Sequence, residues 1–186
     1  MQITKIIPGL LNNSFEFFNV NSEVKFVNNG TLKPFTDLPS SIHSLINQTI
    51  ESNPEAKTIL QEWHPNSEFH QLEKFISCRM GGLDFTPDIT DGVLQEGEYW
   101  ACPNIGNCKG QGILCKNPVY NGHELSSEEI LLIQLSTTNK TNEAIADQLG
   151  KPLGTYHKMK KQIHEKLGNI QTKQCLTKIA YALNLI

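Results

Sequence analysis

The amino-acid sequence predicts a mainly α-helical protein in which a C-terminal helix–turn–helix follows a small α+β domain that contains cysteines. Two observations lead to this prediction. Apolar residues recur at helical spacing in residues 36–80 and 125–183, which is typical of amphipathic helices. Between these stretches, residues 83–122 are rich in Gly, Asp, Asn and Pro and show no such period. We therefore place the domain boundaries at residues 1–120 and 125–186.

The first 34 residues favour β structure. Val24 and Phe26 are β-formers and precede the pair Asn29–Gly30, which often forms the tight turn between two antiparallel strands. We therefore predict a short hairpin or an extended arm here. The opening residues have one lysine and an apolar stretch that Pro8 interrupts, without a small-residue cleavage site, so we do not expect a signal peptide.

Three helices are predicted between residues 36 and 80. Each carries apolar residues at helical spacing and is bounded by residues that start or stop helices. The last of them ends where two glycines follow each other. The predicted caps and breaks are, in order, Ser40 or Ser41, Pro54, Pro65, Asn66 or Ser67, and Gly81–Gly82.

Residues 141–167 predict a helix, a tight turn and a second helix. Thr141 is a suitable N-cap, and Gly150 is the expected stop. In the second helix, from about residue 154 to 167, one apolar stripe faces inward while the other faces carry Lys and His. A helix that is apolar inside and cationic outside suits the major groove of DNA. The stripe is Tyr156, Met159, Ile163 and Leu167.

Four short motifs occur in order from Leu125 onward. They are LSSEE, TNEAIADQLG, the pair Gly154–Thr155, and KLG ending at Gly168. In this order they resemble the LuxR-type helix–turn–helix domain of bacterial transcription regulators. The resemblance implies a four-helix DNA-binding domain that dimerises through its last helix, residues 172–183. The sequence departs from the family at Glu143, where Lys is usual, at Pro152 in the turn, and in having no Arg in this region.

The charge distribution agrees with DNA binding by the C-terminal part of the chain. Residues 125–186 hold eight lysines and five acidic residues, a net +3, whereas residues 1–124 have a net charge of −6. The resemblance, with which this charge distribution agrees, implies a transcription regulator that binds double-stranded DNA as a homodimer on an inverted repeat. The residues expected to contact DNA are Asn142, Thr155, His157, Lys158 and Lys161.

Four cysteines suggest a metal site in the N-terminal part. Cys102, Cys108 and Cys115 are separated by five and six residues, and Cys78 ends the third predicted helix. Thiolates are ligands of structural zinc and of iron–sulfur clusters, and unmetallated thiols are the third alternative. Cys175 stands apart in the last predicted helix, where we expect it to be a buried core thiol.

Other functional classes find no support in the residues. The chain has no run of about eighteen apolar residues, so we expect no membrane span and a cytoplasmic, nucleoid-associated protein. It has no glycine-rich phosphate loop, HExxH or GxSxG motif, so we do not expect an enzyme. Two alternatives stay open: an adaptor that binds RNA polymerase or another regulator through the helix–turn–helix surface, and a regulator that senses redox state or iron through the cysteines.

Overall fold

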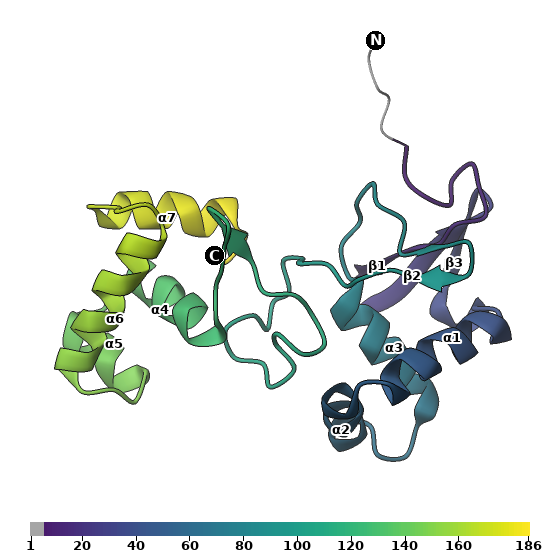
Figure 1. The fold of residues 1–186 in the computed structure, drawn as a ribbon, viewed down its shortest axis with the longest axis horizontal. Helices are drawn as coiled ribbons and strands as arrows, with labels where there is room; N and C mark the ends of the chain where they lie inside the picture. Colours follow the sequence, from purple (N-terminus) through teal and green to yellow (C-terminus); the bar gives the residue numbers. More distant parts are fainter. Residues whose placement is uncertain (1–5) are drawn as a thin grey trace, which may run out of the picture. The chain divides into compact units, whose positions relative to one another are not determined.

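The computed structural model describes residues 6–186, which form a mixed α and β structure (Figure 1). Within these residues there are seven α-helices and three small antiparallel sheets. The structure thus confirms that the chain contains helices and small sheets, and it does not confirm a mainly α-helical chain. The chain divides into two compact units: one runs to Cys102 and includes Ile113–Lys116, and the other comprises Pro103–Gly112 and Asn117–Ile186.

A three-stranded antiparallel meander opens the first unit. Its strands are β1 (Glu16–Val20), β2 (Glu23–Asn28) and β3 (Thr31–Pro34). Asn29 and Gly30 join β2 to β3 with φ angles of 49° and 72°, the left-handed values that a two-residue hairpin turn requires. The predicted hairpin is thus confirmed, and β1 is a strand that the sequence patterns do not indicate.

Three helices follow, as predicted: α1 (Ser40–Glu51), α2 (Pro54–Trp63) and α3 (Glu68–Arg79). The Ser67 side chain caps α3 by accepting the His70 N–H at 3.2 Å. Helix α3 packs against β1 and β2, while α1 and α2 pack against α3 (Figure 1). The short helix η1 (Phe35–Asp37) links the sheet to α1.

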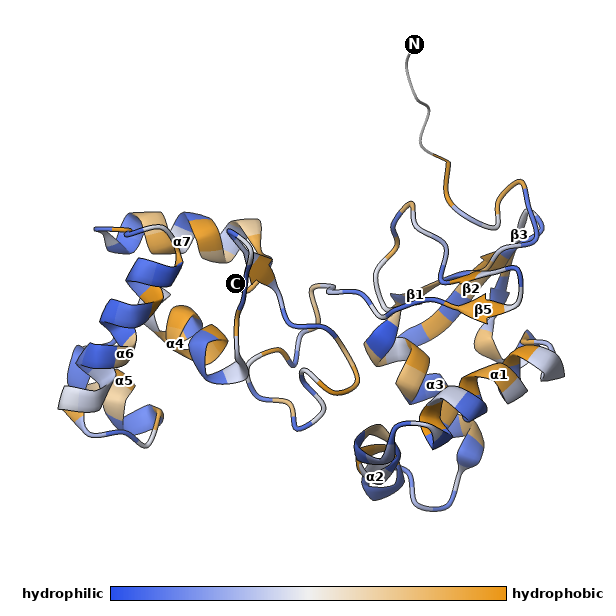
Figure 2. Cartoon of the chain, in the orientation of Figure 1, coloured by the Kyte–Doolittle hydropathy of each residue, from blue (hydrophilic) through white to orange (hydrophobic). Residues whose placement is uncertain are grey.

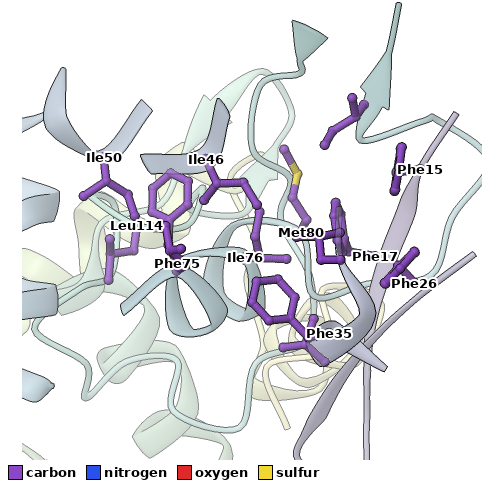
Figure 3. Close-up of a cluster of buried hydrophobic side chains, with 14 of the residues drawn as sticks. Phe15, Phe17, Phe26, Phe35, Ile46, Ile50, Phe75, Ile76, Met80 and Leu114 are labelled. Atoms are coloured by element: carbon purple, nitrogen blue, oxygen red, sulfur yellow. The ribbon is translucent and has the colours of Figure 1, made fainter. Parts of the chain in front are cut away.

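The core of the first unit lies between the sheet and α3 and includes five phenylalanines and four isoleucines (Figure 3). Leu114 and Ile89 belong to this core, with exposed fractions of 1% and 2%. Residues 83–122, which show no periodicity in the sequence, therefore still contribute to the apolar core. Isolated apolar residues of this segment pack in the core because the backbone returns to it. The periodicity of the sequence does not indicate such a return. Ile89 lies in β4 (Ile89–Thr90), which pairs with β5 (Val93–Leu94).

The second unit consists of a small hairpin followed by four helices. Helix α4 packs against the other three helices of the unit. None of the helices within residues 6–186 is long and apolar enough to cross a membrane. The elements are β6 (Val119–Tyr120), β7 (His123–Glu124), α4 (Ser127–Thr137), α5 (Asn142–Gln148), α6 (Leu153–Lys166) and α7 (Lys173–Ala182).

Buried carboxyl groups attach residues 81–98 to β1. Asp88, which is 5% exposed, accepts the Phe17 N–H at 2.6 Å, and Glu16, which is 1% exposed, accepts the Asp84 N–H at 2.8 Å. Burial, with a smaller contribution from neighbouring carboxylates, raises the pKa of Asp88 to about 9 and that of Glu16 to about 7, although the backbone N–H groups that they accept lower both. Glu98 behaves in the same way, with a pKa of about 7. These carboxyl groups therefore hold protons at a pH where exposed ones do not.

We predict that the first unit loses stability as the pH rises from about 4 to 9. Between the ordinary pKa of a carboxyl and its raised value, about 7 for Glu16 and Glu98 and about 9 for Asp88, the folded state keeps a proton that the unfolded chain has released. Within its own interval each such carboxyl lowers the free energy of unfolding by up to about 1.4 kcal/mol per pH unit. Asp88→Asn keeps an acceptor for Phe17 and should flatten this dependence. Urea unfolding followed by tryptophan fluorescence measures it, because Trp63 and Trp100, the protein's two tryptophans, both lie in this unit.

The matched control is Asp91→Asn. Asp91 is an exposed carboxylate in the turn between β4 and β5, with φ at 52°, a conformation that Asn tolerates well. This variant should keep the pH dependence of the wild-type protein. An Asp88→Asn protein with the wild-type slope would contradict the assignment of bound protons to the buried carboxyl groups.

Candidate nucleic-acid interface

Local signals form the helix–turn–helix region. Helix α5 begins directly after the predicted cap Thr141 and ends before the predicted stop Gly150, and α6 differs from its predicted range by one residue at each end. The Thr141 hydroxyl caps α5 by accepting the Ala144 N–H at 3.3 Å. Gly150 then adopts a φ of 64°, and the Lys151 N–H bonds the Ala146 carbonyl at 2.9 Å. A glycine in the left-handed conformation commonly ends an α-helix in this manner. The predicted cap and stop are therefore confirmed.

The buried face of α6 is the predicted apolar stripe. Tyr156, Ile163 and Leu167 are 0%, 1% and 2% exposed, and Met159 is half-buried. The remainder of α6 is mostly hydrophilic (Figure 2). The stripe thus attaches α6 to α4 and α5, and the opposite side of the helix is left to solvent.

All five residues predicted to contact DNA are exposed in the second unit. Thr155, His157, Lys158 and Lys161 lie on α6, and Asn142 is the first residue of α5. The two helices pack against each other. The five side chains therefore belong to one helix pair, and their role in DNA binding stays a prediction.

Ion pairs separate the lysines near α6 into two groups. Lys166 contacts both carboxylate oxygens of Glu129, at 2.9 and 2.7 Å, and Lys151 pairs with Glu128 at 2.7 Å. Glu129 also forms a reciprocal capping box with Ser126 at the start of α4. Lys166 and Lys151 thus attach α6 and the turn to α4. The lysines without such a partner on α4 are Lys158, Lys160 and Lys161.

A shallow groove of about 510 Å³ runs along α6 and the segment after it. His157, Lys160, Lys161 and His164 contribute to its lining, together with Glu165, Asn169, Ile170 and Gln171. Burial lowers the pKa of His164, whose Nδ1 lies 3.1 Å from the Ile170 carbonyl oxygen. Lys160 and Lys161 give the groove positive charge, which suits an anion such as a phosphate.

A hydrogen-bond network connects the two helices, and the sequence patterns do not indicate it. The buried Tyr156 hydroxyl donates to Asn142 Oδ1 at 2.9 Å, and Lys160 Nζ lies 3.4 Å from the same oxygen. Lys160 Nζ also lies 5.9 Å from the centre of the Tyr156 ring, within the range of a cation–π contact. The sequence hints at this network only through the tyrosine in an otherwise apolar stripe, because a buried hydroxyl needs a hydrogen-bond partner.

Glu143 is an acidic residue at the start of α5, beside the predicted contact residue Asn142. Its own backbone N–H, the Thr141 hydroxyl and the charge of His157 lower its pKa. The carboxylate is therefore ionised at neutral pH and lies near His157. A negative charge in this place opposes the approach of a phosphate backbone.

We predict that Glu143→Lys tightens binding to duplex DNA by about 3–10-fold near physiological salt, because it removes a repulsive charge and adds one cation near the phosphates. The slope of log K against log salt should become steeper by about one unit. Titration of a labelled duplex at several salt concentrations measures both quantities. Glu55→Lys, at an exposed position of α2 in the first unit, makes the same change in net charge. Equal gains from the two variants would contradict a local effect.

The four predicted metal ligands are distributed over both units. Cys78, Cys102 and Cys115 belong to the first unit and Cys108 to the second. Burial, with a smaller contribution from the neighbouring Cys102 and Cys115, raises the pKa of Tyr99 to about 12. Within residues 6–186 no group of three or more His, Cys, Asp or Glu side chains is arranged to hold a metal ion. The four-cysteine site therefore stays a prediction from spacing.

Cys175 differs from its prediction. It is exposed on α7, and our expectation of a buried core thiol is wrong. The buried side of α7 is formed by Leu176, Ile179 and Ala180. Cys175 lies in the first turn of the helix, where its N–H bonds the Thr172 hydroxyl at 3.2 Å. Helical spacing alone does not tell whether the preceding or the following neighbour of Leu176 lies on the buried side of the helix.

Comparisons with known proteins give no relative for this chain. No family model matches it, no curated protein matches it, and no solved structure matches it.

Proposed function

We propose that the protein is a sequence-specific DNA-binding transcription regulator that inserts α6 into the major groove. One observation carries this proposal: α6 has a mostly buried apolar stripe on one side and an exposed cationic side on the other. The stripe holds the helix on its own unit, so the exposed side is available to a partner. The order of the LuxR-type motifs supports the same function.

Within this proposal the exposed residues have different roles. Thr155, His157 and Lys158 lie near the start of α6, the end that enters the groove in helix–turn–helix proteins. Lys158, Lys161 and Asn142 contact the phosphate backbone, which supplies affinity without reading sequence. Helices α4 to α7 then form the LuxR-type domain, and the last helix region, residues 172–183, joins two chains on an inverted repeat.

Binding to a labelled duplex pool of random sequence, about 30 base pairs or three helical turns long, tests the proposal. We expect an affinity that falls as salt rises from about 50 to 200 mM, and repeated selection should enrich an inverted repeat. Salt-dependent binding without any enriched sequence favours the adaptor that binds RNA polymerase. A protein that does not bind the pool even at low salt refutes the proposal. Sedimentation that finds one chain per selected duplex counts against the dimer.

The cysteines are proposed to hold zinc as a structural ion, and this rests on their spacing. Metal analysis and an absorption spectrum of protein purified without oxygen test it. About one zinc per colourless chain supports the structural role. Iron with absorption near ~400 nm supports the sensor alternative instead. Protein without metal identifies the cysteines as thiols.

A further inference from the structure

The Tyr156 side chain is built to reach Asn142. Tyr156 is 0% exposed, and its ring lies in the apolar stripe of α6. Phenylalanine would fill the same space, so the hydroxyl is the only part of the side chain that packing does not require. That hydroxyl lies 2.9 Å from Asn142 Oδ1 on the neighbouring helix. A buried hydroxyl with one well-placed partner fixes the orientation of that partner.

The chemistry of Lys160 decides which end of the Asn142 amide faces inward. An ammonium group has only donors, and Lys160 Nζ lies 3.4 Å from the amide atom that Tyr156 also contacts. That shared atom is therefore the oxygen, and the Tyr156 hydroxyl is a donor to it. The Asn142 NH₂ group is consequently left with two donors, and among residues 6–186 no protein group accepts them.

The NH₂ group suits an acceptor that comes from outside the protein. Asn142 is exposed, and it is the first residue of α5, next to the exposed side of α6. Phosphate oxygens accept hydrogen bonds and donate none, so they match two outward N–H groups. A carboxamide that is free to rotate would present its oxygen to the phosphate for part of the time, and that orientation is repulsive.

We propose that Tyr156 is a positioning residue that, with Lys160, holds the Asn142 amide so that its NH₂ group donates to a phosphate of the DNA backbone. This inference rests on the proposed DNA-binding function. It assigns Tyr156 a role besides packing, and it assigns Lys160 to the hydrogen-bond network between α5 and α6. The contact is independent of base sequence, so any duplex can serve as the probe.

A double-mutant cycle on a labelled duplex of random sequence tests the proposal. Tyr156→Phe removes only the hydroxyl and should weaken binding about 3–10-fold, the usual net worth of one hydrogen bond. Asn142→Ala should weaken binding at least as much. In the Asn142→Ala background Tyr156→Phe should have no further effect, because the group that it orients is gone. None of these changes should alter the salt slope, since no charge is removed.

Asn142→Asp supplies a second test that leaves Tyr156 intact. Aspartate still accepts from Tyr156 and Lys160, but it replaces the outward NH₂ group with an anionic oxygen. It should therefore bind DNA more weakly than Asn142→Ala. Equal losses from Tyr156→Phe in both backgrounds, or an Asn142→Asp protein that binds as well as wild type, would overturn the inference while DNA binding itself stood. A wild-type protein that fails to bind the duplex would refute the proposed function and this inference together.

Discussion

Replacing Lys158 and Lys161 together with alanine is expected to weaken binding to duplex DNA by about 10–100-fold at physiological salt. Both side chains are exposed on α6. Lys158 has no acidic partner among the described residues, and Lys161 has only Glu165, at 3.9 Å. Each lysine that neutralises a phosphate releases about one counterion, so the salt slope should fall by about 0.9 for each residue. Titrations of one duplex at several salt concentrations measure the slope and the affinity.

The matched control is the double variant Lys151→Ala and Lys166→Ala. It removes the same net charge from the same unit, but these lysines pair with Glu128 and Glu129 at the start of α4. Its salt slope should stay close to that of the wild type, and its thermal stability should fall, because Glu129 loses a partner that is only 26% exposed. Equal slopes for the two double variants would show that net charge alone attracts DNA, and α6 would lose its assigned role.

Leu114→Ala is expected to lower the free energy of unfolding of the first unit by about 2–5 kcal/mol. Leu114 is 1% exposed and belongs to the cluster that includes Phe75 and Ile76 (Figure 3). Removing its branched end leaves a cavity in a core that relaxes only partly. The expected loss is a large part of the stability of an ordinary domain, which is about 5–15 kcal/mol.

This prediction also tests how the chain is divided. Ile113–Lys116 belongs to the first unit although residues 103–112 belong to the second. The Lys116 ammonium pairs with Glu96 at 2.9 Å, and the backbone N–H of Lys116 donates to the Glu98 carbonyl at 3.3 Å. Urea unfolding followed by tryptophan fluorescence reports on this unit, and Leu83→Ala, at a site that is 51% exposed, should change stability by less than about 0.5 kcal/mol. Equal effects of the two variants would mean that Leu114 does not support the core.

Short-range signals in the sequence determined most of the helices. Helix α2 has the bounds Pro54–Trp63 that the prolines and apolar spacing indicate, and Ser67 caps α3 as expected. Thr141 and Gly150 bound α5 as predicted. Caps, glycine stops and helical periodicity act within about one turn of the chain, so they can be read without knowledge of the fold. The exposure of the predicted DNA-contact residues follows from the same periodicity.

Only the tertiary structure decided which distant residues meet. Asp88 bonds the Phe17 N–H across 71 positions, and Leu114 joins a core formed by earlier residues. Lys166 forms an ion pair, unlike Lys158, because the start of α4 places Glu129 beside it. The contact between Tyr156 and Asn142 depends on how α5 packs against α6. These contacts arise from the packing of whole elements, and their hydrogen bonds and ion pairs gain strength only after burial removes water. No pattern within a few residues of either partner contains that information.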